Sequence, residues 1–322
     1  MKVLYIGGTG QISFDCVHRS VTAGHDVSVF NRGNSNEGLP GEAELITGDM
    51  NDDAAYRALA ERNFDAVCQF RLFTPEQVER DIRVFDGKCG QYVFISSASA
   101  YQKPVLDPVI TEDVPLVNPH WVYSRNKAAC EAVLRGSELP WTIVRPSHTY
   151  RTSFILPFGG DTVAKRMEDG KPVVVHGDGT SLWTVTRAED FAVPFVNLLG
   201  NERAMREDFH ITTHMRAYPW RRILLAVGAA LGVEPKIVCV PTDELIKRQP
   251  DWEGPLWGDK AWSVLFDNTK VQAVAGEVPC TFTVEEGQAA AAVYYKARRD
   301  AGRLSVDAEA DSVMDQVLTS RC

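Results

Sequence analysis

The sequence KVLYIGGTGQIS, residues 2–13, decides the fold class. Its apolar run at 3–6 is typical of a buried strand, and three glycines follow within four positions. Glycines there let the backbone turn sharply and approach a pyrophosphate closely. A helical stretch then begins, and the N–H groups at a helix N-terminus favour an anion. Strand, glycine turn and helix therefore predict a dinucleotide-phosphate site, with an ordinary tight turn as the alternative.

The glycine motif departs from GxxGxxG at its end, where Ser13 replaces the third glycine. That glycine normally serves helix–strand packing rather than phosphate contact. Because serine is small, we expect phosphate binding to survive the change. The residues predicted to hold the phosphates are Gly7, Gly10, Gln11 and Ile12.

Strand and helix patterns alternate through the first half of the chain. After the first strand, apolar runs predict strands at 27–30, 43–47, 65–70, 91–96 and 141–145. Helical patterns occupy 11–23, 53–62, 75–85 and 121–135. This alternation predicts an α/β fold with a Rossmann-like, doubly wound parallel sheet. We expect residues 1–150 to form this dinucleotide-binding domain, with segments near 180–215 returning to it.

The second half of the chain is less regular. Glycines and prolines punctuate 157–180, and only 220–231 is a clear helix. We expect 151–300 to form mainly a smaller, C-terminal substrate-binding portion. Residues 301–322 hold several acidic side chains and no aromatic one, which predicts a poorly ordered tail.

Composition narrows the function classes. The formal net charge of −9 counts against a nucleic-acid partner, because phosphate backbones attract basic surfaces. No signal-peptide pattern and no run of 18 apolar residues occur, so we expect no membrane segment. The 7 cysteines include no CxxC pair, which favours reduced thiols in a cytoplasmic protein and no metal site.

The end of the second predicted strand bears on the choice of cofactor. An NAD enzyme usually presents an acidic residue there to the adenosine ribose, but this chain has Asn31-Arg32. Arg32 can pair with a 2′-phosphate, so we expect NADP, while NAD remains possible and Arg32 can also be a solvated loop residue. After the third strand come Asp49 and Met50, where a carboxylate can hold the adenine amino group.

A candidate catalytic pair lies in the predicted helix at 121–135. Tyr123 and Lys127 are four residues apart and so share one helix face. Tyrosine has an ordinary pKa near ~10, and a neighbouring ammonium lowers it toward the range needed for proton transfer. Serines at 96, 97 and 99 follow the fifth strand, at the sheet edge where ligands bind. They can orient the same alcohol, or simply form a turn.

Together these residues resemble the extended short-chain dehydrogenase/reductase superfamily, the NAD(P)-dependent epimerase/dehydratase family. The resemblance is carried by the glycine motif, Asp49, FISSASAY at 94–101, the Tyr123/Lys127 pair, and RP at 145–146. GDG at 177–179 and DFA at 190–192 add to it, so it covers about 1–200 firmly. It implies Ser97 as the serine that acts with Tyr123 and Lys127. It also implies that Lys127 contacts the nicotinamide ribose and that the protein is a homodimer through helices near 75–87 and 121–135.

Several positions depart from a typical nucleotide-sugar epimerase. His148 stands where the family often has asparagine, and Trp183 where an arginine often grips the substrate diphosphate. Each can contact substrate or pack in the core. Arg71 can clamp an anion or be an exposed helix-cap residue. Ala98 and Ser99 replace the Asp-Glu pair of the dehydratases, which disfavours elimination and leaves Ser99 as a substrate contact.

The leading expectation is an NAD(P)-dependent epimerase for a sugar or nucleotide sugar, which oxidises an alcohol to a ketone and then returns the hydride. The alternative is a net alcohol dehydrogenase or ketone reductase. A third possibility, of another class, is a non-catalytic or RNA-binding member of the fold. The intact Ser97, Tyr123 and Lys127 weigh against it.

Overall fold

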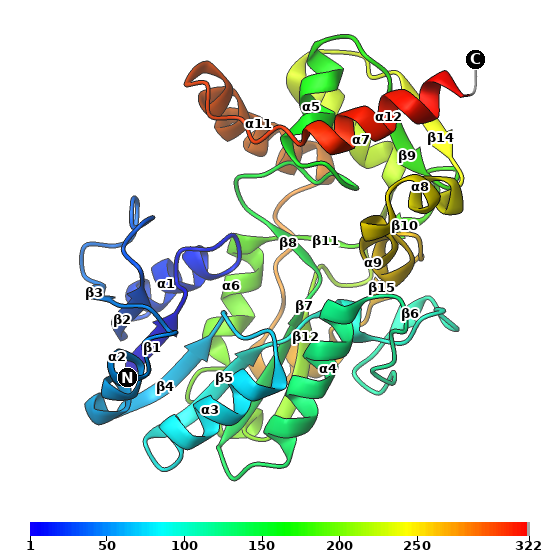
Figure 1. Ribbon diagram of the computed structural model, residues 1–322. Helices are drawn as coiled ribbons and strands as arrows, with labels where there is room; N and C mark the ends of the chain where they lie inside the picture. The colour runs from blue at the N-terminus through cyan, green and yellow to red at the C-terminus, as the bar shows by residue number, and fades with distance from the viewer. Residues whose placement is uncertain (321–322) are drawn as a thin grey trace.

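The computed structural model describes residues 1–320 and places a seven-stranded parallel sheet at their centre (Figure 1). From edge to edge the strands are β12 (Glu207–Ile211), β7 (Trp141–Pro146), β5 (Cys89–Ile95), β4 (Phe64–Gln69), β1 (Lys2–Ile6), β2 (Asp26–Asn31) and β3 (Glu44–Thr47). The chain order reverses between β1 and β4, and α/β sheets bind ligands beyond the carboxyl ends of the strands at such a point. The predicted α/β class and parallel sheet are confirmed.

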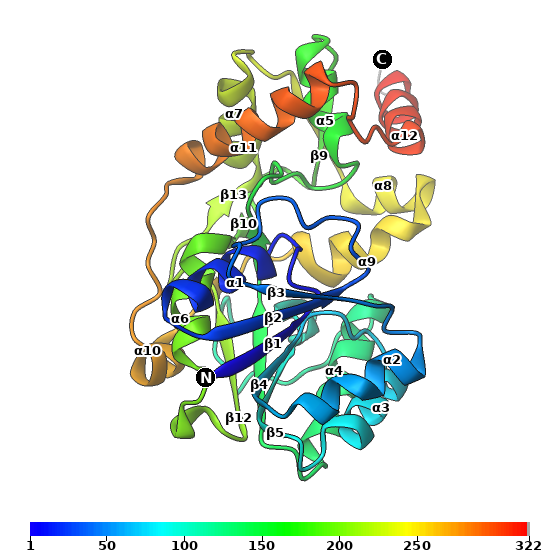
Figure 2. The ribbon, with the colours of Figure 1, turned by 90° about the vertical axis from the view of Figure 1, so that its left-hand side faces the viewer.

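Helices cover both faces of the sheet (Figure 2). One face carries α1 (Ser13–Thr22), α6 (Ala188–Asn197) and α10 (Thr269–Ala275); the other carries α2 (Asp53–Ala58), α3 (Pro75–Phe85) and α4 (Val122–Arg135). Strand β1 shows why both faces need cover. Val3 and Tyr5 pack in the core under α1 and α6, whereas Leu4 and Ile6 pack in the core on the opposite face. A strand buried on both faces reads as a continuous apolar run, as the sequence does.

Most predicted elements in the first half agree with the structure within one or two residues. Helix α3 has the predicted bounds. It begins at Pro75 because proline is favoured at the first position of a helix, directly after the capping residue Thr74. The predicted helix 53–62 is shorter than expected, since α2 ends at Ala58 and a 3₁₀ turn occupies Leu59–Arg62. Among residues 1–320, no helix combines the length and the apolarity that crossing a bilayer requires.

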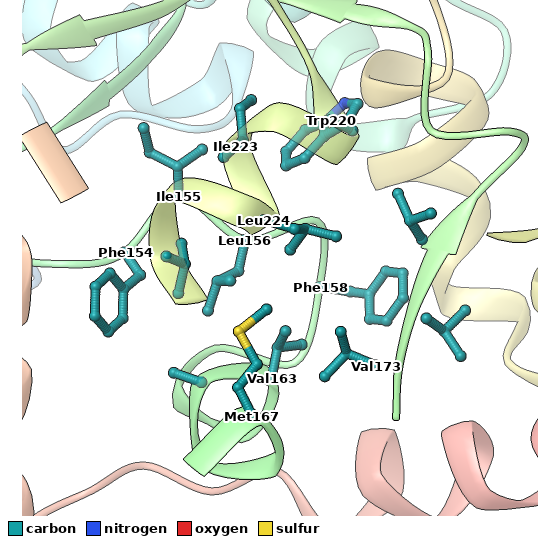
Figure 3. Close-up of a cluster of buried hydrophobic side chains, with 14 of the residues drawn as sticks. Phe154, Ile155, Leu156, Phe158, Val163, Met167, Val173, Trp220, Ile223 and Leu224 are labelled. Atoms are coloured by element: carbon teal, nitrogen blue, oxygen red, sulfur yellow. The ribbon is translucent and has the colours of Figure 1, made fainter. Parts of the chain in front are cut away.

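A second group of elements, the upper group, lies above the carboxyl edge of the sheet (Figure 1). It comprises α5 (Asp161–Glu168), α7 (Trp220–Leu231), α8 (Thr242–Arg248), α9 (Glu253–Pro255), α11 (Val284–Asp300), and the paired strands β9 (Val173–His176) and β14 (Ile237–Val240). Figure 3 shows its apolar core, where α5 and α7 pack through Val163, Met167, Ile223 and Leu224. This core is distinct from those that flank the sheet.

Short strand pairs lie between the two groups. They are β6 (Val109–Ile110) with β15 (Leu265–Phe266), β8 (His148–Tyr150) with β11 (Val185–Arg187), and β10 (Leu182–Trp183) with β13 (Tyr218–Pro219). After β11 the chain returns through α6 and β12, and β12 pairs in parallel with β7. The segment 188–211 thus supplies one strand of the sheet and one helix that packs on it.

The prediction of a poorly ordered tail is wrong for α12 (Ala308–Thr319). Val313, Met314 and Val317 of this helix are buried in the core of the upper group. Two of its acidic residues form ion pairs with the buried guanidinium of Arg166. A carboxylate oxygen of Asp311 lies 2.5 Å from this group, and one of Asp315 lies 2.7 Å from it. Two of the acidic residues in this segment therefore serve as partners of a buried arginine in an ordered helix and are not a sign of disordered chain. Residues 321–322 lie outside the described part.

Candidate active site

The glycine turn forms one wall of a cavity of about 470 Å³ at the carboxyl edge of the sheet. Gly7 has φ +87°, and a Cβ there would lie 2.4 Å from the side chain of Arg71, so the turn needs glycine. The cavity brings together Gly7, Gly10, Gln11, Ile12, Asn31, Arg32, Asp49 and Met50, which are all the predicted cofactor residues except Lys127. A space bounded by glycine backbone at a helix N-terminus fits the phosphates of a dinucleotide.

Ser13 braces the glycine turn, which the sequence did not predict. Its hydroxyl donates to the carbonyl oxygen of Gly7 at 2.7 Å and accepts from the N–H of Gly10 at 2.9 Å. The residue that replaces the third glycine therefore fixes the shape of the turn. It also engages the Gly10 N–H, and the Gly7 N–H donates to the carbonyl oxygen of Phe30 at 3.0 Å, so both of these N–H groups are used within the protein.

The Gln11 side chain is bonded to a segment far along the chain. Its Oε1 accepts from the N–H groups of Arg151 at 3.1 Å and Thr152 at 3.0 Å, and its Nε2 donates to the Thr152 hydroxyl at 2.9 Å. Gln11 nevertheless lines the first cavity, where its backbone and its second amide N–H remain available. Its side chain links the turn to the segment that leads into the upper group.

At the other end of the cavity, Asn31 shapes a loop. Its Oδ1 accepts from the N–H of Gly33 at 2.6 Å, and its Nδ2 donates to Asn36 at 2.8 Å. Arg32 is exposed and makes no ion pair or hydrogen bond with residues 1–320. Its guanidinium is therefore available to an anion. Asp49 uses one carboxylate oxygen to accept from the N–H of Asn51 at 2.9 Å, which leaves the other for a ligand.

A second cavity, of about 270 Å³, collects the predicted catalytic and substrate residues. Its walls include Ser97, Ser99, Tyr123, His148 and Trp183, which are far apart in sequence. Arg71 is not among them, because it lies across Gly7 in the first cavity. The structure therefore places Arg71 with the cofactor residues, away from the site where it was expected to hold substrate. Nowhere in residues 1–320 do three metal-binding side chains form a ligand set.

A chain of serine hydroxyls orients Ser97. The hydroxyl of the buried Ser124 donates to Ser99 Oγ at 2.7 Å, and Ser99 Oγ lies 2.8 Å from Ser97 Oγ. Because Ser99 Oγ accepts from Ser124, its own proton is directed to Ser97. The Ser97 proton is then available to a group in the cavity. Ser99, expected to contact substrate, thus also positions Ser97.

Tyr123 lies beside Ser97 at the start of α4. Burial raises the pKa of the Tyr123 phenol, the hydrogen bond with Ser97 lowers it, and the negative charge of Asp259 raises it. In the protein alone the phenol is therefore held in its protonated form. That form can donate a proton to a substrate carbonyl oxygen.

Lys127 lies one helical turn below Tyr123 and is 2% exposed. Its ammonium donates to the carbonyl oxygens of Leu72 and Ile95, both at 2.7 Å, and lies 5.8 Å from the centre of the Tyr123 ring. These two bonds fix its position and leave one N–H free. Burial lowers the pKa of Lys127 to about 8.

This pKa predicts a pH dependence of stability. In the unfolded chain Lys127 keeps its proton up to its ordinary pKa of 10.5, so between pH 8 and that value the unfolded state binds more protons than the folded state. The free energy of unfolding should therefore rise with pH across this window, by about 3 kcal/mol from this group. We expect the wild type to gain this amount relative to Lys127→Met in urea denaturation at a series of pH values. Parallel profiles for the two proteins would contradict the prediction.

The structure leaves open both roles that the sequence allowed for His148 and Trp183, substrate contact and core packing. Trp183 is 4% exposed and packs in the upper core, yet it lines the second cavity. The His148 ring lies 6.1 Å from the Trp183 ring, edge to face. Burial, together with the charge of Lys260, lowers the pKa of His148 to about 3. His148 is therefore neutral at pH 7 and can donate or accept a hydrogen bond.

The second cavity also contains residues that the sequence did not single out, and three of them carry an ionisable group or an indole ring. They are Trp121, Asp259 and Lys260. The last two lie more than 130 positions from Tyr123, in a π-helical turn, Leu256–Lys260. The available signal was local: three tryptophans and two glycines fall within 252–262, an unusual density for a surface loop.

Comparison with known proteins places these observations in a family context. A model described as the NAD dependent epimerase/dehydratase family matches residues 3–212. The chain is 31% identical over 225 residues to the chloroplast stem-loop binding protein of 41 kDa b of Arabidopsis thaliana, a match covering 66% of this chain and 58% of that protein. It is 27% identical over 281 residues to the 2′-dehydrokanamycin reductase of Streptomyces kanamyceticus, covering 83% of this chain and 77% of the reductase.

The fold is also found among solved structures. That of UDP-glucuronic acid 4-epimerase from Bacillus cereus in complex with NAD superposes with a TM-score of 0.72. The superposition covers 92% of this chain and 99% of the epimerase, at 16% sequence identity. At this level of identity the likeness shows a shared fold.

Proposed function

Because the chain belongs to the NAD-dependent epimerase/dehydratase family, we propose that it is an NAD(P)-dependent enzyme that interconverts a secondary alcohol and a ketone on a sugar-like substrate. One observation carries the proposal: Ser97 and Tyr123 line a single cavity, and the Lys127 ammonium lies one turn below the phenol. A bound nicotinamide would accept or supply the hydride at the reacting carbon. Tyr123 moves the proton of the substrate oxygen, and Ser97 holds that oxygen by a hydrogen bond.

The first cavity supports a preference for NADP. Arg32 lies at the carboxyl end of β2 with no partner among the described residues, and the residues at that end are Asn31 and Arg32 rather than a carboxylate that would repel a 2′-phosphate. A charge-assisted hydrogen bond is worth about 1.5–3 kcal/mol, which is tenfold or more in affinity.

We expect Arg32→Ala to weaken NADP⁺ binding about tenfold or more and to leave NAD⁺ binding unchanged, because only NADP⁺ carries the 2′-phosphate. Calorimetric titration of both cofactors would measure this. Arg83→Ala, which removes an exposed arginine from α3, is the matched control. Equal affinities of the wild type for the two cofactors would contradict the preference, as would unchanged NADP⁺ binding by the Arg32 variant.

Two outcomes of the chemistry are possible, and each has support. Epimerisation, the leading expectation from the sequence, keeps the cofactor bound while the ketone presents its other face. Net reduction needs only one orientation of the substrate. A cavity of about 270 Å³ is small beside the usual ~300–1,000 Å³ of ligand pockets, and the relative with the larger covered share is named a reductase. These two points support net reduction, which is the second candidate after epimerisation.

The cofactor that purifies with the protein would distinguish the two outcomes. A stoichiometric nicotinamide retained through gel filtration, detected by mass and absorbance, is expected for an epimerase. Net reduction requires exchange, so the protein would purify free of cofactor and bind it reversibly. The second result would leave the redox proposal intact and reject epimerisation.

The expectations for domain roles, oligomeric state, cellular location and partner are likewise proposals. Residues 1–150, with the returning segment near 180–215, would bind the cofactor, and 151–300 would mainly bind substrate. A homodimer would form through α3 and α4, which lie side by side on one face (Figure 2). A cytoplasmic location fits the free cysteines at 16, 68, 89, 130, 239 and 280. The net charge of −9 supports a small-molecule substrate over RNA, although one relative is named for binding stem-loops.

A further inference from the structure

We propose that Asp259 and Lys260 form the substrate-recognition subsite, and that the substrate is a compact, uncharged polyhydroxylated molecule, a free sugar or cyclitol, without a nucleotide diphosphate. The proposal deepens the proposed function, since it names the substrate class for the same cavity. It concerns residues outside the sequence motifs of the cofactor and catalytic sites.

The two charged side chains share the cavity with the catalytic groups. Both line the second cavity with Ser97 and Tyr123, and both are half-buried. Neither side chain makes a hydrogen bond or an ion pair within residues 1–320; the Lys260 ammonium lies 5.7 Å from the Trp183 ring centre. Half-buried charges without hydrogen bonds are costly, so a ligand that supplies hydrogen bonds would be bound favourably.

The backbone beneath this pair is held rigidly. Asn118 Nδ2 donates to the carbonyl oxygens of both Ser99 and Gly258 at 2.7 Å, which ties the catalytic serine segment to the residue before Asp259. The carbonyl oxygen of Lys260 accepts from Trp220 Nε1 at 3.2 Å and lies 3.0 Å from His176 Nε2. Such supports fix a site before the ligand arrives.

Close packing adds to this support. A Cβ on Gly254 would lie 2.2 Å from the Trp121 ring, and one on Gly258 would lie 2.8 Å from Trp121 Cβ. The π-helical turn is therefore packed directly against the start of α4, next to Tyr123. Single π turns occur often at functional sites, because they place side chains that a regular helix would not.

The charges of the cavity favour an uncharged ligand. Among the residues that line the cavity, Asp259 and Lys260 carry opposite charges, His148 is neutral at pH 7, and none is an arginine. The buried Lys103, which also interacts with Asp259, does not line the cavity. A diphosphate would bring two negative charges to a single cation that lies beside a carboxylate, in a cavity of only about 270 Å³.

The same residues suit a sugar ring. A carboxylate accepts from two neighbouring hydroxyl groups and an ammonium donates to others. Trp121 and Trp183 add aromatic side chains to the cavity wall, where the C–H groups of a sugar ring can pack. Asp259 would then bind hydroxyls adjacent to the carbon that reacts at Tyr123. Asp259 is therefore expected to select the configuration of those hydroxyls.

The test measures binding separately from turnover. A library of free monosaccharides and cyclitols, with UDP-glucose and glucose 6-phosphate as charged comparators, is titrated by ligand-observed NMR into protein saturated with NADP⁺. We expect at least one uncharged member to bind more tightly than both comparators. Asp259→Asn and Lys260→Met should each weaken that binding about tenfold or more. Asp251→Asn and Lys247→Met change exposed, unpaired residues nearby and should leave it unchanged.

Each outcome decides between defined alternatives. Preference for UDP-glucose, no binding by any uncharged member, or equal binding by wild type and Asp259→Asn would overturn the subsite. NADP⁺ affinity is measured for every variant, and an unchanged value shows that the fold is intact. Binding of uncharged sugars that depends on Asp259, without any hydride transfer, would support the subsite and reject the proposed redox function instead.

Discussion

Tyr123→Phe is expected to lower turnover by about 10²-fold or more, the usual scale for loss of a proton-transferring group. The change removes one oxygen atom from a half-buried side chain and leaves the ring, so the fold and cofactor affinity should not change. The measurement is the rate of cofactor oxidation or reduction with the sugar that binds best. Tyr294→Phe, which removes the same atom from an exposed tyrosine on α11, is the matched control. Turnover near the wild-type rate would remove Tyr123 from the mechanism.

The second large effect concerns stability. Arg145 is 1% exposed and makes two hydrogen bonds to Glu131, at 2.9 Å and 2.6 Å, and an ion pair with Asp208 at 2.7 Å. It joins β7, α4 and β12 under the catalytic helix. Arg145→Met would leave the buried Glu131 carboxylate short of partners, and loss of one partner of a buried pair costs about 3–5 kcal/mol.

Urea denaturation would measure this loss as a fall in the free energy of unfolding. Arg222→Met is the matched control, because Arg222 makes a similar pair with Glu285 on the surface and exposed pairs are worth at most about 1 kcal/mol. The double change Arg145→Met with Glu131→Leu should recover part of the loss, since it removes the stranded charge. A loss for Arg145→Met no larger than that for Arg222→Met would show that the buried network does not stabilise the fold.

The parts of the fold that were predicted from the sequence depend on local signals. The strand, glycine turn and helix at 2–13 lie within twelve residues, and Tyr123 and Lys127 lie on one helix face by spacing alone. The position of the Arg71 side chain and the order of the C-terminal tail were predicted less well. Arg71 follows β4, but its side chain lies across Gly7, which depends on the neighbouring strand. The acidic tail was misjudged because its partner, Arg166, lies 145 positions earlier.

Tertiary packing accounts for what the sequence did not reveal in the site. Asp259 and Lys260 line the catalytic cavity on a turn that packs through Gly254 and Gly258 against Trp121, which is far away in the sequence. The bracing of the glycine turn by Ser13 is local, but the small size of serine predicts only that the turn is tolerated. Its hydroxyl donates to one turn residue and accepts from another, which spacing alone does not predict.

The central claim is that this chain transfers hydride between a nicotinamide and a sugar-like alcohol at Tyr123. The most direct measurement loads the protein with NADPH that carries deuterium at both C4 positions of the nicotinamide, adds a library of oxo sugars, and analyses the products by mass spectrometry. The claim predicts deuterium on the carbinol carbon of a product with the wild type, and a strong reduction with Tyr123→Phe. A protein that binds the cofactor yet leaves all of the deuterium on it would contradict the claim.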